Sequence, residues 1–253
     1  LLRNLCHLRN LRSFLHCRLG METDLMNHSM RSRFLAVVAK RPAPGQTKTR
    51  LCPPLTGAEA AALYECFLAD TLDVMRQMEG VEPAIIYLPE DESDYFRSLA
   101  PDFVLHPQRG DDLGARLDNL LRDALAAGAR YAVVMDSDSP TLPVSCVADA
   151  YARLEAGADV VFGPCDDGGY YLVGVTRPQP RILREVAMST ATVLADSLAI
   201  ADSLGLKVAL LPTWYDVDTG AELERLQAEL AQLPDDTARH TRRWLAERAE
   251  ATR

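Results

Sequence analysis

Apolar and polar residues alternate along the chain in blocks of two kinds. Short apolar runs are typical of buried strands, whereas longer segments with an apolar residue every three or four positions are typical of amphipathic helices. Strands are predicted at 34–39, 83–88, 103–106, 131–135, 158–163, 170–175 and 206–211. Helices are predicted at about 57–75, 91–98, 113–125, 144–154, 191–204, 220–232 and 235–253. Thr56 and Thr219 each precede a glutamate by three residues, the pattern of a capping box at a helix start.

The alternation of strands and helices predicts the fold class. It indicates an α/β protein, a three-layer α/β/α sandwich whose mostly parallel sheet is covered by helices on both faces. Loops that leave parallel strands share one edge of the sheet, and ligands collect at that edge. We assign a catalytic domain to residues 33–233 and a charged helix or tail to residues 234–253.

Residues 1–32 differ in composition from the rest of the chain. The opening stretch LLRNLCHLRNLRSFLHCRLG contains four arginines, two histidines and no acidic residue. We predict a disordered or non-native extension here. An organellar transit peptide is the alternative, because such peptides are also rich in arginine and poor in acids.

Composition and charge limit the kinds of molecule that this protein is expected to bind. The net charge of −9 disfavours a nucleic acid, whose phosphate backbone requires clustered lysines and arginines. No apolar run approaches the ~20 residues of a membrane span, so none is predicted. The six cysteines are scattered without a C-x-x-C pair, which disfavours zinc and favours reduced thiols in the cytoplasm.

Pairs of acidic residues follow several predicted strands. Asp136 and Asp138 end the apolar run YAVVM, and Asp216 and Asp218 follow the last predicted strand. Two similar pairs are Asp111-Asp112 and Asp166-Asp167. Carboxylates that converge on one edge repel unless a cation is present, and oxygen ligands suit Mg²⁺ or Mn²⁺. Asp138 and Asp218 are the preferred metal ligands and Asp136 and Asp216 the alternates. Ordinary Asp-rich turns are the competing interpretation.

The loop after the first strand has the opposite charge. Residues 39–51, AKRPAPGQTKTRL, bring four cations into this acidic protein, and Gly45 allows a tight turn. These cations are Lys40, Arg41, Lys48 and Arg50. Such a loop suits a phosphate chain, although it matches neither a Walker A loop nor a dinucleotide fingerprint. A solvated basic loop is the alternative.

Two further segments are candidates for the substrate cleft. The first, predicted to bind substrate, comprises Asp167, Gly168, Gly169 and Tyr170. Its alternative is an Asp-Gly-Gly hairpin turn between two strands. The second, predicted to bind the nucleotide, comprises Asp112, Gly114 and Arg116. Its alternative is a helix N-cap at Asp112.

Six ordered blocks together resemble a known family. They are AKRPAPGQTKTRL, LTGAEAAALY, DLGAR, DSDSPTLP, GPCDDGGYYLVG and WYDVDT, and they lie within residues 34–230. The pattern is similar to the rSAM/selenodomain-associated transferase type 1 family, a glycosyltransferase-like group in the nucleotide-diphospho-sugar transferase superfamily. The resemblance implies the GT-A fold, a nucleotide over the first half of the sheet, phosphates near Lys48 and Arg50, and a divalent metal on the D-x-D aspartates. Asp136 is extra, since the family often has Gly at that position.

These observations lead to a functional expectation. We expect a metal-dependent, glycosyltransferase-like transferase that takes a nucleotide sugar and a small-molecule acceptor, with Lys48, Asp138 and Asp218 as catalytic residues. The alternative is a nucleotidyltransferase that joins an NTP to a phosphate- or phosphonate-bearing small molecule and releases pyrophosphate. The KTRL segment is similar to the triphosphate-contacting loop of 2-phospho-lactate guanylyltransferases. A non-catalytic nucleotide-binding module is the third possibility.

Overall fold

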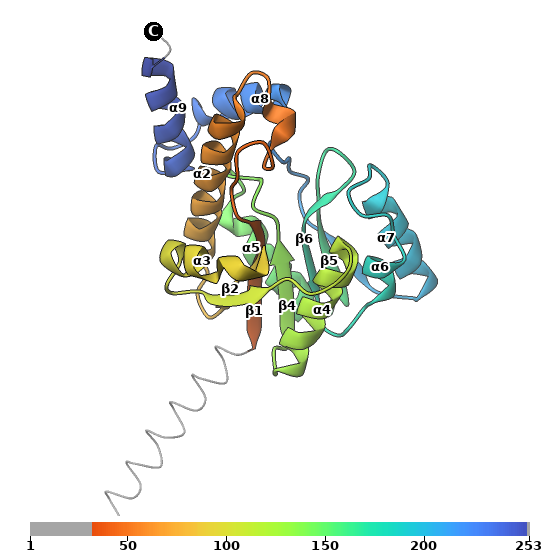
Figure 1. Ribbon diagram of the computed structural model, residues 1–253. Helices are drawn as coiled ribbons and strands as arrows, with labels where there is room; N and C mark the ends of the chain where they lie inside the picture. Colours follow the sequence, from red (N-terminus) through yellow and green to blue (C-terminus); the bar gives the residue numbers. More distant parts are fainter. Residues whose placement is uncertain (1–31, 252–253) are drawn as a thin grey trace, which may run out of the picture.

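A seven-stranded sheet forms the centre of the molecule (Figure 1). The computed structural model describes residues 32–251. The strands are β1 (Arg33–Lys40), β2 (Glu82–Leu88), β3 (Val104–Pro107), β4 (Tyr131–Met135), β5 (Val160–Pro164), β6 (Tyr170–Val175) and β7 (Val208–Leu210). Their order is β3-β2-β1-β4-β6-β5-β7, and every neighbouring pair is parallel except those that include β6. The predicted mostly parallel sheet is therefore confirmed.

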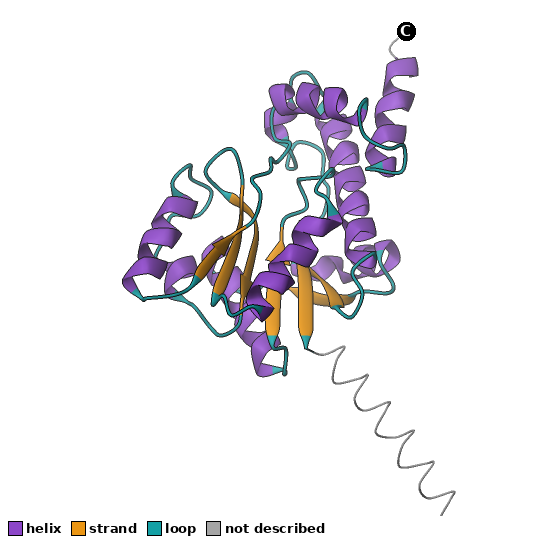
Figure 2. Ribbon diagram, turned by 180° about the vertical axis from the view of Figure 1, so that it is seen from behind, coloured by secondary structure: helices purple, strands orange, loops and turns teal. Residues whose placement is uncertain are grey.

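Helices cover both faces of this sheet (Figure 2). They are α2 (Gly57–Arg76), α3 (Ser93–Leu99), α4 (Leu113–Ala126), α5 (Val144–Glu155), α6 (Arg181–Arg184), α7 (Val193–Ser203), α8 (Gly220–Leu230) and α9 (Arg239–Ala251), with short 3-10 helices η1 (Thr49–Leu51) and η2 (Glu90–Glu92). One core cluster joins Val37 and Val133 to α2, α3 and α5. Another joins Ala36 and Val134 to α4, α6 and α7. Successive strand residues point to opposite faces, so this division confirms the three-layer α/β/α sandwich.

A third core cluster lies beyond the carboxyl edge of the sheet. It joins η1 and α2 to α8 and to the segment before α8, through Leu51, Phe67, Val217 and Leu226 among others. Both predicted capping boxes, at Thr56 and Thr219, are present at the starts of α2 and α8. This cluster fixes the loop after β1 against the segment after β7, although the two are far apart in sequence.

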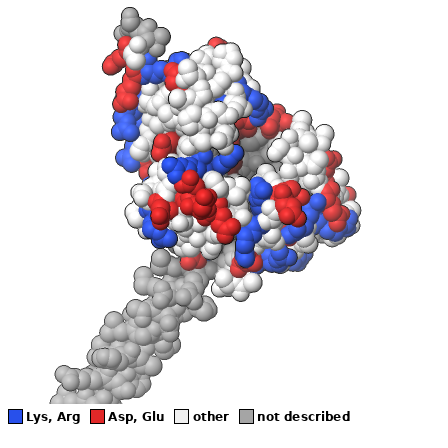
Figure 3. Space-filling model, in the orientation of Figure 1, with Lys and Arg blue, Asp and Glu red and all other residues white. Residues whose placement is uncertain are grey.

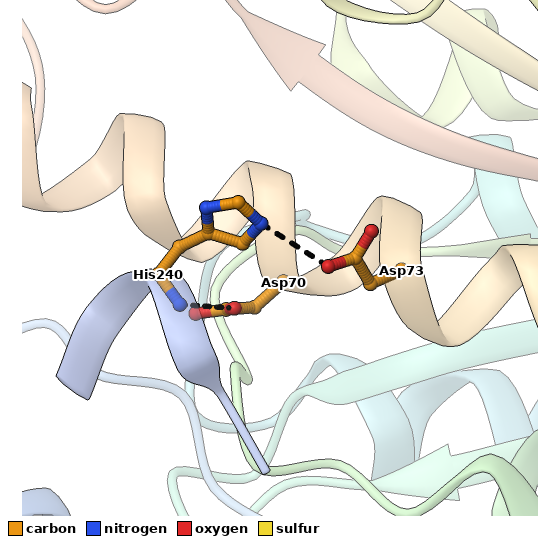
Figure 4. Close-up of side chains that lie close together, drawn as sticks. All are labelled: Asp70, Asp73 and His240. Atoms are coloured by element: carbon orange, nitrogen blue, oxygen red, sulfur yellow. Dashed lines mark hydrogen bonds and ion pairs between the residues drawn. The ribbon is translucent and has the colours of Figure 1, made fainter. Parts of the chain in front are cut away.

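The C-terminal helix α9 docks on α2 through buried polar contacts (Figure 4). Asp70, which is 3% exposed, accepts the backbone N–H groups of His240 and Thr241 at 2.9 Å each. These are unpaired donors at a helix start, so the carboxylate caps α9 from a neighbouring helix. His240 Nε2 also lies 3.1 Å from Asp73 Oδ2. A helix thus occurs in the predicted C-terminal segment, while the domain boundary at 233 stays a prediction.

The antiparallel strand β6 departs from simple alternation of strand and helix. A tight turn joins β5 to β6, and within it the Cys165 N–H donates to the Gly169 carbonyl at 3.0 Å. Gly168 has a φ of +89°, a conformation that glycine adopts without steric cost. The segment is therefore a hairpin turn, while its predicted role in substrate binding stays a prediction. Because β6 runs backwards, the turn lies at the carboxyl edge of the parallel strands.

The remaining sequence predictions concern termini, membranes and thiols. The extension predicted for residues 1–32 lies, apart from Ser32, outside the described residues. Within residues 32–251 no helix has the length and apolar character that a membrane crossing requires. The four described cysteines, Cys52, Cys66, Cys146 and Cys165, carry free thiols.

Candidate active site at the carboxyl edge of the sheet

A cavity of about 850 Å³ opens at the carboxyl ends of the parallel strands. Loops that follow β1, β4, β5 and β7 line it, together with residues 188–191. Figure 3 shows this face hollowed between the part with α2 and α8 and the part with α6 and α7, with basic and acidic side chains beside the hollow. A volume of this size is typical of a small-molecule or cofactor site.

Lys48 joins two of the predicted carboxylates inside this cavity. Its Nζ lies 2.9 Å from Asp138 Oδ2 and 2.5 Å from Asp218 Oδ1, and its side chain is only 5% exposed. Arg50 forms an ion pair with Asp218 Oδ2. The structure thus brings together the basic loop after β1, the D-x-D segment after β4 and the D-x-D segment after β7, as expected for one shared sheet edge.

The backbone holds this group in place. Lys48 has a left-handed φ of 51° just before η1, a conformation that is uncommon for a residue with a Cβ and typical of functional sites. Leu51 then anchors the loop in the third core cluster. The Val217 N–H donates to the Asp138 carbonyl at 3.0 Å, which ties the two acidic segments together.

The positive charge of Lys48 and the negative charges of Asp138 and Asp218 stabilise one another. Burial disfavours the ammonium of Lys48, yet the carboxylates of Asp138 and Asp218 hold its pKa above the ordinary value. Burial also disfavours the Asp218 carboxylate, but Lys48 and Arg50 hold the pKa of Asp218 below its usual range. Lys48 therefore remains charged and the pairs remain intact at neutral pH.

Other carboxylates on this rim have no cationic partner. Within residues 32–251, Asp136, Asp167 and Asp216 form no ion pair with a lysine, arginine or histidine. Burial, with the negative charge of Asp138, raises the pKa of Asp136 well above its usual range. Burial, with the charges of Asp218 and Asp167, raises the pKa of Asp216 to about 6. In the metal-free protein these shifts favour the neutral, protonated form of Asp136 and, below about pH 6, of Asp216.

The donor set fits a hard divalent cation. Ligand atoms of Asp167, Asp216 and Cys165 lie within 4.8 Å of one another. Burial raises the pKa of the Cys165 thiol, so it is neutral and a poor ligand. The remaining oxygens suit Mg²⁺ or Mn²⁺. The sequence ranked Asp138 and Asp218 first, whereas in the structure both are paired with cations and the alternates are the free carboxylates.

We predict that Asp216→Asn stabilises the metal-free protein at about pH 8 by roughly 1 kcal/mol, an amount already reduced for partial exposure. The folded-state pKa of about 6 lies above the ordinary value of 3.8, so folding favours the protonated acid. Stability from this group therefore falls as pH rises from about 4 to about 6. Denaturant unfolding with a chelator should show a gain at about pH 8 that vanishes at about pH 4. The exposed Asp236→Asn is the control, and an equal gain at both pH values would contradict the assignment.

Two site residues escaped the sequence analysis. The Tyr64 hydroxyl lies 2.9 Å from Ser137 Oγ and accepts the Lys40 N–H at 3.2 Å. Ser137 Oγ donates to the Val38 carbonyl at 3.0 Å. Burial, with the charge of Asp138, raises the pKa of Tyr64 to about 12, so it remains a neutral hydrogen-bonding group. Tyr64 fits the apolar spacing of α2, so its sequence position indicated only a core residue.

The other predicted nucleotide residues separate into two groups. Lys40 and Arg116 line the cavity. Arg41 instead pairs with Glu92, and its guanidinium lies 5.0 Å from the centre of the Tyr95 ring. The remaining residues have local structural partners. Asp112 caps α4 by accepting the Ala115 N–H, Gly114 packs against the Leu183 carbonyl, and Gly45 approaches Gly57 at the start of α2.

Most of the predicted substrate segment lines the same cavity. Asp167, Gly169 and Tyr170 line it, and Asp167 Oδ1 accepts the Gly169 N–H at 2.8 Å. Gly168 lies behind the wall, where a Cβ would come within 2.0 Å of the Ala191 carbonyl. This contact positions the lining loop 188–191, which sequence analysis did not select because the loop carries no charged or aromatic residue.

A second acidic cluster does not compete as a metal centre. Ligand atoms of Asp70, Asp73 and His240 also lie within 4.8 Å of one another. However, Asp70 uses both oxygens to cap α9, and Asp73 pairs with Arg76 and Arg239 as well as His240. These contacts explain the cluster as the attachment of α9.

Known proteins resemble this chain in sequence over part of its length and in fold over most of it. A family model described as an uncharacterised protein conserved in bacteria, DUF2064, matches residues 71–190. No curated protein matches the chain in sequence. The solved structure of CMP:2-keto-3-deoxy-manno-octonic acid synthetase complexed with CTP is 14% identical, with a TM-score of 0.52, over 79% of this chain and 99% of that chain. The 4-diphosphocytidyl-2C-methyl-D-erythritol synthase from Anaerococcus prevotii is 11% identical, with a TM-score of 0.52, over 80% and 98%. These two show the fold alone.

A more similar structure shows the family. It is that of a candidate nucleotide-diphospho-sugar transferase from Desulfovibrio desulfuricans G20. That protein is 30% identical, with a TM-score of 0.79, and the match covers 85% of this chain and 96% of that chain. The narrower transferase type suggested by the motif blocks stays a prediction. The chain thus belongs to the same family as the Desulfovibrio protein, and its residues 71–190 carry the DUF2064 pattern.

Proposed function

We propose that this protein is a metal-dependent transferase that uses a nucleotide sugar as donor and a small molecule as acceptor. The observation that supports it best is the meeting of Lys48 and Arg50 with Asp138 and Asp218 in one cavity. Glycosyl transfer leads because the relative with 30% identity is named for nucleotide-diphospho-sugar chemistry.

In this proposal the cationic side chains bind the donor phosphates. Lys48 and Arg50 would contact the diphosphate, and Lys40 and Arg116 line the same cavity. When the acceptor oxygen attacks the anomeric carbon, the bond to the diphosphate breaks and negative charge grows on the leaving oxygen. Fixed positive charge at that oxygen lowers the barrier.

The carboxylates would hold the metal. Asp136 and Asp216 are free to accept a divalent ion, and Asp138 and Asp218 become available when their cations move. The metal would supply charge neutralisation at the phosphates. Asp167 and Tyr170, which line the same cavity, would bind acceptor or sugar hydroxyls.

Nucleotidyl transfer is the second candidate. Here a substrate phosphate or phosphonate oxygen attacks the α-phosphorus of an NTP, and pyrophosphate leaves. It is favoured by the number of cations, since Lys40, Lys48, Arg50 and Arg116 line one cavity and suit a triphosphate better than a diphosphate.

We predict that a nucleotide with Mg²⁺ raises the melting temperature, because a ligand that binds only the folded state stabilises it. The panel contains GTP, CTP, UTP, ATP and their sugar nucleotides. Selective stabilisation by a sugar nucleotide supports glycosyl transfer, and selective stabilisation by a triphosphate supports nucleotidyl transfer. Mass spectrometry of products with the selected nucleotide then identifies the bond that is made.

Matched lysine variants test whether the stabilisation comes from this cavity. Lys48→Ala should lose most of it, whereas Lys207→Ala, an exposed lysine outside the cavity, should keep it. If no nucleotide shifts the melting temperature of the unaltered protein, both transferase candidates are wrong.

A further inference from the structure

We propose that Lys48 acts as an internal counter-ion that keeps Asp138 and Asp218 from binding a metal until nucleotide phosphates draw it away. Metal and nucleotide then strengthen each other's binding. This inference rests on the proposed function and adds to it the coupling between the two ligands.

The geometry makes the two states mutually exclusive. The Lys48 ammonium lies within 2.9 Å of an oxygen on Asp138 and within 2.5 Å of an oxygen on Asp218. A metal held by these same two oxygens, Asp138 Oδ2 and Asp218 Oδ1, would have to take the place of the Lys48 ammonium. Two cations cannot occupy one position, because their atoms would overlap and their like charges would repel each other. Lys48 must therefore move before these two oxygens can become ligands.

The local charge balance gives the direction of the coupling. Lys48 and Arg50 neutralise Asp138 and Asp218 without any added ion. A divalent metal alone would displace a buried ammonium and leave it without a partner, which is costly in a site that is only 5% exposed at Lys48. A polyphosphate supplies new anionic partners for both displaced side chains. Ligation of a metal by Asp138 and Asp218 is thus unfavourable alone and favourable with the nucleotide.

The Lys48 loop is suited to such an exchange. Lys48 and the 3-10 helix η1 that follows it place Lys48 and Arg50 two residues apart on one short segment. Lys48 and Arg50 also line the cavity in which the phosphates would bind. Coupling of this kind is reciprocal by thermodynamic linkage.

Manganese titrations without nucleotide test the inference directly. Free Mn²⁺ is measured by electron paramagnetic resonance in the unaltered protein and in three variants. Lys48→Gln removes the competing ammonium, so its Mn²⁺ affinity should rise about tenfold. Arg50→Gln frees one Asp218 oxygen, and its affinity should rise by a smaller factor of roughly three. Lys40→Gln changes the lysine at the end of β1, which takes no part in the contacts of Lys48 with Asp138 and Asp218, and controls for the loss of one charge.

The outcomes separate this inference from the proposed function. Mn²⁺ affinity that is unchanged or lower in both Lys48→Gln and Arg50→Gln overturns it, as does an equal rise in Lys40→Gln. Arg50 is 68% exposed, so its variant should fold even if Lys48→Gln does not, and it then decides the question by itself. If no nucleotide binds the unaltered protein while Mn²⁺ affinity still rises in the variants, the proposed function fails but the internal counter-ion remains.

Discussion

Asp138→Asn is expected to lower turnover about a thousandfold while the protein remains folded. Asp138 follows β4 at the carboxyl edge of the sheet, and its side chain is 32% exposed. The amide that replaces it has the same shape but no charge, so it neither neutralises Lys48 nor ligates a metal well. Lys48 keeps Asp218 as its partner, which is why the fold should survive.

The measurement is initial rate with the nucleotide selected by the melting panel, at saturating Mg²⁺. Circular dichroism and the melting temperature report the fold. Asp166→Asn is the matched control, because Asp166 lies on the same rim but pairs with Arg225 and does not line the cavity. Normal turnover in Asp138→Asn, or an equal loss in Asp166→Asn, would remove Asp138 from the catalytic role.

Gly114→Ala is expected to destabilise the fold by about 3 kcal/mol, the upper end of the range for overpacking. A Cβ at this position would lie 2.0 Å from the Leu183 carbonyl oxygen and 3.0 Å from its carbon. These are backbone atoms of α6, so no side-chain rotation relieves the clash. Helix α4 would have to move away from α6 and from the core cluster that both helices share.

Urea unfolding monitored by tryptophan fluorescence gives the change in free energy. Ala126→Ser, on an exposed position of the same helix, is the control and should change stability little. If Gly114→Ala unfolds like the unaltered protein but binds nucleotide weakly, the glycine serves the ligand as the sequence first suggested.

The architecture was predictable because its signals are local. A continuous apolar run such as 131–135 and the helical spacing of a segment such as 57–75 are set by which side chains must be buried. The strands at 131–135 and 170–175 therefore match observed strands at the same bounds. The direction of β6 was open, since a Gly-Gly turn suits both a hairpin and a ligand loop.

The sequence predicted which residues gather at the site but not how their side chains pair. Acidic pairs after strands and a basic loop after β1 indicated one shared edge from topology alone. Which cation meets which carboxylate depends on side-chain directions, as the different fates of Arg41 and Lys48 show. Arg41 turns outward to Glu92, whereas the left-handed backbone at Lys48 turns its side chain inward.

Amino-acid order by itself thus determined the strands, the helices, their caps and the residues at the sheet edge, because these follow from periodicity and neighbouring residues. Only the tertiary structure decided that Lys48 bridges Asp138 and Asp218, that Gly114 serves helix packing, and that Tyr64 supports the cavity. Each of these depends on atoms from segments far apart in the sequence, whose approach is governed by the packing of the whole core.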